Sequence, residues 1–93
     1  MNLTYIRIPL HKLNYVNNIE EAMNFTQEFE AGYKSIYDLE TRSNIFEQLE
    51  WARKNREYDL ARFAKLEGKY TNEQILKYVD CIYDFLLERK LFE

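Results

Sequence analysis

Residues 71–88 carry the pattern that most constrains the fold of this chain. Thr71 is followed three residues later by Gln74, the pairing of a capping box, which predicts that a helix begins here. Behind this cap, apolar residues recur at helical spacing over an arc of about 200°. The centre of the arc consists of Ile75, Val79, Ile82 and Leu86. A helix with so wide an apolar surface must be enclosed by neighbouring helices.

Three further segments show the helical spacing of apolar residues. The first begins at Asn17 and Asn18, each followed three residues later by a glutamate, and is expected to run to about Ala31, where Gly32 ends it. The second covers about 43–55 and the third about 58–67, which Gly68 ends. Their inward residues are expected to be Ile19, Ala22, Met23, Thr26, Phe29 and Tyr33, then Ile45, Phe46, Leu49 and Ala52, then Leu60, Ala61, Phe63 and Ala64.

The N-terminal residues show a different pattern. Residues 3–8 alternate and are rich in β-branched and aromatic types before Pro9, which predicts a short strand or extended arm. Such an arm either packs on its own helices or pairs with another chain by strand addition. The sequence thus predicts an all-α fold, a three- to four-helix bundle with a short extended or β N-terminal arm. Residues 1–93 form one helical domain, with the arm at 1–13 and helices within 17–93.

Length and hydropathy limit the class of protein. At 93 residues, 46% of them hydrophobic, the chain supports one modest core, because folding at this size buries roughly 60–65% of the surface. No apolar run exceeds four residues, so we expect neither a membrane-spanning segment nor a signal peptide. Cys81 has no second cysteine to pair with, which favours a reducing compartment. These features predict a cytoplasmic protein.

The composition disfavours catalysis. His11 and Cys81 are the single histidine and the single cysteine, and they cannot form a structural zinc site. Neither Gly32 nor Gly68 lies in a phosphate-binding loop. We therefore expect no enzyme activity, no metal and no cofactor. Cys81 borders the apolar arc of the last helix and is interpreted as a small core residue.

The aromatic content favours binding instead. Eight tyrosines, six phenylalanines and one tryptophan occur in the chain, and Trp, Tyr and Arg dominate the energetics of protein interfaces. Trp51 lies off the apolar face of its helix, close in sequence to Arg53, Arg56 and Tyr58. These four residues, with Tyr5 of the arm, are the candidate partner-binding residues. Trp51→Ala is expected to lower partner affinity by about 2 kcal/mol or more; the alternative is that Trp51 packs on the arm and its loss unfolds the protein.

The net charge of −3 conceals a segregation of charge. Residues 19–50 hold eight acidic and two basic residues, whereas residues 51–69 hold six basic and three acidic ones. Such blocks are commonly solvated faces. The alternative is that the acidic block imitates nucleic-acid phosphates and occupies a basic groove of a partner.

A DNA-binding alternative arises from residues 60–77, where a helix, a turn containing Gly68 and a capped helix follow one another. The second helix, however, carries Glu73, Asp80 and Asp84 where DNA phosphates require cations, so nucleic acid is not the expected partner.

We therefore expect a non-catalytic, small acidic protein that binds another protein as an inhibitor, immunity-type factor or regulatory adaptor, with a homodimer left open. Phe, Tyr, Asn, Lys and Ile, whose codons are AT-rich, total 36 residues, against 14 for Gly, Ala, Arg and Pro. This bias indicates a bacterial or phage genome.

Overall fold

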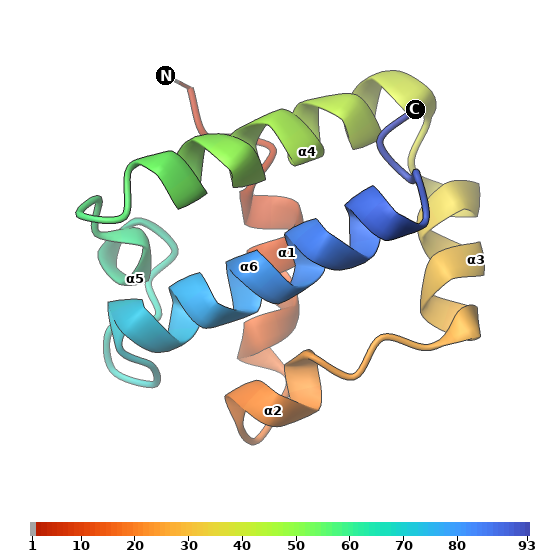
Figure 1. Ribbon diagram of the computed structural model, residues 1–93. Coiled ribbons are helices and arrows are strands. Elements are labelled where there is room, and N and C mark those ends of the chain that lie inside the picture. The colour runs from red at the N-terminus through yellow and green to blue at the C-terminus, as the bar shows by residue number, and fades with distance from the viewer. Residues whose placement is uncertain (1) are drawn as a thin grey trace.

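The computed structural model describes residues 2–93, which contain helices and no strand. The elements are α1 (Arg7–His11), the 3-10 helix η1 (Lys12–Asn14), α2 (Ile19–Ala22), α3 (Gln27–Ile36), α4 (Leu39–Lys54), α5 (Leu60–Phe63) and α6 (Asn72–Glu88). Figure 1 shows α6 crossing the middle of the molecule, with α4 and α2 on either side of it, α1 behind it, and α3 and α5 at opposite ends. The predicted all-α class is confirmed. The three- to four-helix bundle is not confirmed, because the described residues form six α-helices, of which only α3, α4 and α6 have ten residues or more.

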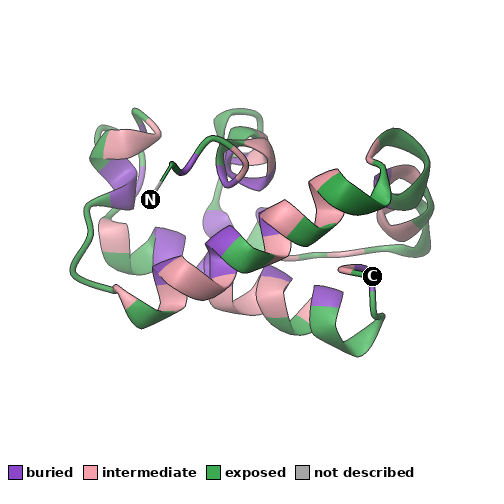
Figure 2. Cartoon of the chain, turned by 90° about the horizontal axis from the view of Figure 1, so that it is seen from above, coloured by how far each residue is buried: buried purple, intermediate pink, exposed green. Residues whose placement is uncertain are grey.

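Helix α6 has the predicted start and the predicted buried face. The Thr71 hydroxyl accepts a hydrogen bond from the Gln74 backbone N–H at 3.1 Å, and the Gln74 side chain accepts one from the Thr71 N–H at 2.9 Å. All four residues at the centre of the arc are buried, as is the neighbouring Tyr78. One hydrophobic cluster includes residues of every helix, and Figure 2 shows in purple the buried positions along the helices. Because α6 is enclosed on several sides, its stability comes from packing as well as from its cap.

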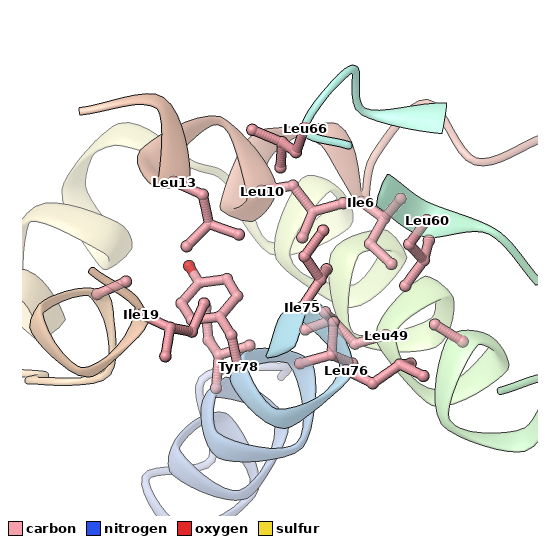
Figure 3. Close-up of a cluster of buried hydrophobic side chains, with 14 of the residues drawn as sticks. Ile6, Leu10, Leu13, Ile19, Leu49, Leu60, Leu66, Ile75, Leu76 and Tyr78 are labelled. Carbon is pink, nitrogen blue, oxygen red and sulfur yellow. The ribbon is translucent and has the colours of Figure 1, made fainter. Parts of the chain in front are cut away.

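The prediction of an extended N-terminal arm was wrong, since residues 4–6 form a turn and α1 follows directly. Ile6, Leu10 and Leu13 are spaced by four and three residues, a helical period, and all are buried. Figure 3 shows Leu10 and Leu13 pointing toward α6. Pro9 is tolerated because it is the third residue of α1, where a backbone N–H has no partner within the helix.

The N-terminal segment packs on its own chain, one of the two alternatives that the sequence left open. Gln48 of α4 is 7% exposed, and its side chain accepts a hydrogen bond from the Ile6 N–H at 2.9 Å. The same amide donates to the Asn2 carbonyl oxygen at 2.6 Å. These bonds satisfy backbone groups that no strand partner satisfies.

The helix expected from Asn17 to Ala31 is divided into α2 and α3. Asn18 caps α2 as predicted, accepting a hydrogen bond from the Glu21 N–H at 2.8 Å. Thr26, expected to face the core, is exposed and caps α3 by accepting from the Phe29 N–H at 3.2 Å. The interruption brings Phe25 within 5.0 Å of both Phe29 and Phe85, measured between ring centroids. Gly32 lies inside α3 and does not end it.

The second and third predicted helices also differ at their ends. Helix α4 begins earlier than expected, because Asp38 caps it by accepting from the Thr41 N–H at 2.8 Å. Helix α5 is shorter than the predicted 58–67 segment. It ends at Phe63, two residues before Lys65, whose φ of 59° lies in the left-handed region, and not at Gly68.

Candidate functional site

Trp51 and Tyr58 form the centre of the candidate site. Trp51 is half-buried on α4 and packs against the hydrophobic cluster, and its ring meets that of Tyr58 edge to face at 5.3 Å. Tyr58 follows the end of α4 in a turn in which its N–H donates to the Asn55 carbonyl oxygen at 3.0 Å. Asn72 at the start of α6 donates to the Tyr58 carbonyl oxygen, also at 3.0 Å. These two bonds fix the turn that returns Tyr58 to Trp51.

Two residues from elsewhere in the chain extend this pair. The Phe63 ring of α5 lies 6.2 Å from that of Tyr58, and the Arg7 guanidinium of α1 lies 4.6 Å from the centre of the Phe63 ring. We call Trp51, Tyr58, Phe63 and Arg7 the aromatic strip. Phe63 was expected to face the core and is half-buried, and no sequence pattern predicted its contact with Arg7.

Arg53 and Arg56 are turned toward α6 by ion pairs. Both bind the Asp80 carboxylate, Arg53 through Nε at 3.1 Å and Arg56 through two nitrogens at 3.0 and 3.2 Å. The Arg53 guanidinium also lies 4.1 Å from the centre of the Tyr83 ring. Hydrogen bonding to Asp80 raises the pKa of Arg56. These two arginines therefore form a separate ion-paired group, which the sequence could not reveal because Asp80 lies on another helix.

Tyr5 is not part of the aromatic strip. It is half-buried and packs against the hydrophobic cluster, and its carbonyl oxygen accepts a hydrogen bond from the Ile8 N–H at 3.1 Å. Of the five predicted partner-binding residues, the structure brings Trp51 and Tyr58 together, pairs Arg53 and Arg56 with Asp80, and places Tyr5 on the core.

The acidic residues of segment 19–50 do not form one row. They belong to α2, α3, α4 and the adjoining turns, and these helices run along three different edges of the molecule (Figure 1). Glu30 pairs with Arg89 at 3.5 Å, and Glu50 pairs with Lys54 at 2.9 Å. The proximity of Lys54 lowers the pKa of Glu50. No observation on this surface favours nucleic-acid mimicry, which stays a prediction.

Helices α5 and α6 are the pair expected for DNA binding. Helix α5 contains only the four residues Leu60–Phe63, and Asp80 on α6 binds two arginines of this same chain. No contact here favours the DNA-binding alternative.

His11 and Cys81 contact neighbours within the fold. The His11 ring meets Tyr15 edge to face at 5.1 Å. Cys81 is half-buried, and burial raises the pKa of its thiol. Within residues 2–93, no three His, Cys, Asp or Glu side chains are grouped so as to hold a metal ion. Over the same range, no helix is both long and apolar enough to cross a membrane.

Comparison of the chain with models of protein families, with curated proteins and with solved structures found no match.

Proposed function

We propose that this chain is a non-catalytic binding protein whose partner is another protein, and that it acts as an inhibitor, immunity-type factor or regulatory adaptor. The observation that carries the proposal is the aromatic strip, in which Trp51, Tyr58 and Phe63 contact one another in series and Arg7 covers one end. Trp, Tyr and Arg are the residue types in which interface binding energy is concentrated. A reducing compartment is the proposed setting, because Cys81 is the sole cysteine.

The strip is suited to binding because its rings are held before a partner arrives. Tyr58 is 37% exposed, yet its backbone is fixed on both sides by hydrogen bonds to Asn55 and Asn72. Covering a ring that is already ordered costs little conformational entropy, so more of the buried apolar area contributes to affinity. Arg53 and Arg56 are assigned a place at the edge of the interface, where charges chiefly affect the rate of association.

A photo-crosslinking experiment tests which surface meets the partner. A photoreactive phenylalanine derivative is introduced at Tyr58 in one variant and at Ile36 in another, and each is irradiated in host cytosol. Ile36 is 72% exposed and ends α3, at the opposite end of the molecule from α5 (Figure 1). We expect one protein to be crosslinked from position 58 and not from position 36. Equal crosslinking from both positions would contradict the proposal.

Affinity measurements with that partner then test the contribution of the strip. Tyr58→Ala is expected to weaken binding at least about ten-fold, because it removes the exposed ring and the edge-to-face contact that holds the Trp51 ring in place. Tyr15→Ala is the matched control, since Tyr15 is 76% exposed and contacts His11 instead of the strip. Trp51→Ala is less informative, because Trp51 packs against the hydrophobic cluster and its loss is expected to reduce stability as well. A Tyr58→Ala variant that binds as the parent does would overturn the proposed interface.

A further inference from the structure

A cavity of about 240 Å³ lies between α1, α3 and α6. Ile8, Phe29 and Ile82 contribute to its largely apolar wall. Helices α2, α4 and α5 pack directly on α6, whereas α3 stands at the end of the molecule (Figure 1) and reaches α6 through rings such as Phe29 and Phe85, 5.8 Å apart. Because α3 does not pack directly on α6, space remains beside α1. For comparison, an apolar cavity of roughly 150 Å³ in a protein interior can hold benzene.

One polar group in the wall lacks a partner. Tyr33 is 5% exposed, and its hydroxyl has no hydrogen-bond partner among residues 2–93. Tyr78, which also lines the cavity, has its hydroxyl bonded to the Pro9 carbonyl oxygen at 2.8 Å. Buried polar groups are nearly always hydrogen-bonded, so this unpaired hydroxyl is a group that a ligand can satisfy; its oxygen is itself enclosed, and a ligand reaches it only when a neighbouring side chain moves. Burial raises the pKa of Tyr33, which keeps the hydroxyl protonated and able to donate.

The charge at the cavity is positive. The Lys12 ammonium donates to the Ala22 carbonyl oxygen at 2.9 Å and lies 4.8 and 5.0 Å from the ring centres of Phe25 and Phe29. Its contacts are therefore a carbonyl and two rings, with no carboxylate among the residues that line the cavity. Burial lowers the pKa of Lys12, a sign that its charge is incompletely solvated. The electrostatic attraction between this ammonium and an anion placed beside it is therefore stronger than it would be in water.

We infer that this cavity binds a small apolar carboxylate. Its aromatic or branched aliphatic body lies against Ile8, Phe29 and Ile82, and its carboxylate accepts hydrogen bonds from the Lys12 ammonium and the Tyr33 hydroxyl. Scaling from the benzene cavity gives a ligand of about ten non-hydrogen atoms. The site is distinct from the aromatic strip, because Ile8 of α1 and Lys12 of η1 line the cavity beside α3, whereas Arg7 of α1 lies on Phe63 of α5.

Phenylacetate and phenylacetamide provide a matched pair of probes, because they share shape and size and differ in charge. Each is titrated into the ¹⁵N-labelled full chain and followed by ¹H–¹⁵N correlation spectra. We expect phenylacetate to bind with a Kd of about 1 mM or tighter, with shifts centred on α1, α3 and the middle of α6. The amide is expected to bind at least about ten-fold more weakly. No binding, shifts centred elsewhere, or equal binding of the amide would each overturn the inference.

Three variants identify the groups involved. Lys12→Met keeps much of the apolar stem but removes the charge, and is expected to weaken phenylacetate binding about ten-fold and to abolish the preference over the amide. Tyr33→Phe is expected to weaken binding about three-fold or more without lowering the melting temperature, because the hydroxyl it removes has no partner within the fold. Lys69→Met is the control, since Lys69 also donates to a backbone carbonyl and lies 5.5 Å from a ring centre, that of Tyr70, outside the cavity. Unchanged affinity in Lys12→Met or Tyr33→Phe, or an equal loss in Lys69→Met, would contradict the inference.

Discussion

The buried phenol of Tyr78 donates a hydrogen bond of 2.8 Å to the carbonyl oxygen of Pro9, joining the central helix α6 to α1. Helix α1 has only five residues, and a helix that short is not stable in isolation. Its position therefore depends on tertiary contacts of this kind. The same bond anchors one wall of the cavity between α1 and α3.

Tyr78→Phe tests this anchor. The substitution keeps the ring in the core but removes the bond to the Pro9 carbonyl oxygen, so we expect the free energy of unfolding to fall by about 1–2 kcal/mol. Urea unfolding measures the change. Tyr83→Phe is the matched control, because the Tyr83 hydroxyl lies 3.4 Å from Glu50 in a half-buried contact, and its loss should cost less. Equal effects of the two substitutions would show that the Pro9 bond has no special importance.

Gln48→Leu tests how the N-terminal segment is held. It leaves the Ile6 N–H and the Asn2 carbonyl without the amide that binds both, and we expect destabilisation of about 1–3 kcal/mol. Hydrogen exchange should also accelerate at the Ile6 amide. Gln27→Leu, at an exposed position on α3, serves as control. If Ile6 exchanges at the same rate in Gln48→Leu as in the parent, the bond does not protect the segment.

Local sequence signals predicted the helices where cap and apolar pattern agreed. Helix α6 is the clearest case, because the Thr71 cap and the apolar arc both indicate the same helix. At the N-terminus, the two-residue alternation of 3–8 predicted a strand, whereas the spacing of Ile6, Leu10 and Leu13 indicated a helix. The structure has the helix, and these three residues are buried. Bonds from Gln48 and Tyr78, more than forty residues away, favour that outcome, and no local pattern contains them.

In the candidate site, too, contacts between residues close in sequence could be predicted, whereas contacts between distant residues could not. Trp51 and Tyr58 are close in sequence, and a short turn suffices to bring them together. Arg7 of α1 and Phe63 of α5 meet only through the tertiary fold, so periodicity within either helix cannot predict the contact. The unpaired hydroxyl of Tyr33 was likewise beyond prediction, since helical spacing places that ring inward without showing what its hydroxyl meets.

Asp80→Asn tests the energy of the ion-paired group. The Asp80 side chain is 36% exposed, so solvent screens its bonds to Arg53 and Arg56, and we expect a loss of no more than about 1 kcal/mol. The loss should shrink when unfolding is measured in about 1 M salt, where the Debye length is roughly 3 Å. Asp84→Asn, on the same helix, is the control. A loss that does not respond to salt would indicate that the effect is not ionic.

The last prediction concerns acid stability and the start of α4. The Thr41 backbone N–H donates to the Asp38 carboxylate at 2.8 Å, and this bond lowers the pKa of Asp38 in the folded state. A lowered pKa contributes stability that is present above the unfolded value, about 3.9, and that is lost as pH falls through the folded value. Asp38→Asn keeps an oxygen that can cap the helix but does not titrate, whereas Asp38→Ala removes the cap at every pH.

We therefore expect Asp38→Asn to have nearly the same melting temperature as the parent at pH 7. Between about pH 5 and pH 2, the melting temperature of Asp38→Asn should fall less than that of the parent. Asp38→Ala should melt lower than the parent at pH 7, and the gap should narrow as the parent carboxylate becomes protonated. Thermal unfolding across this pH range, followed by circular dichroism, provides the comparison. Parallel curves for the parent and Asp38→Asn would mean that the charge on Asp38 contributes nothing to the cap beyond the hydrogen bond itself.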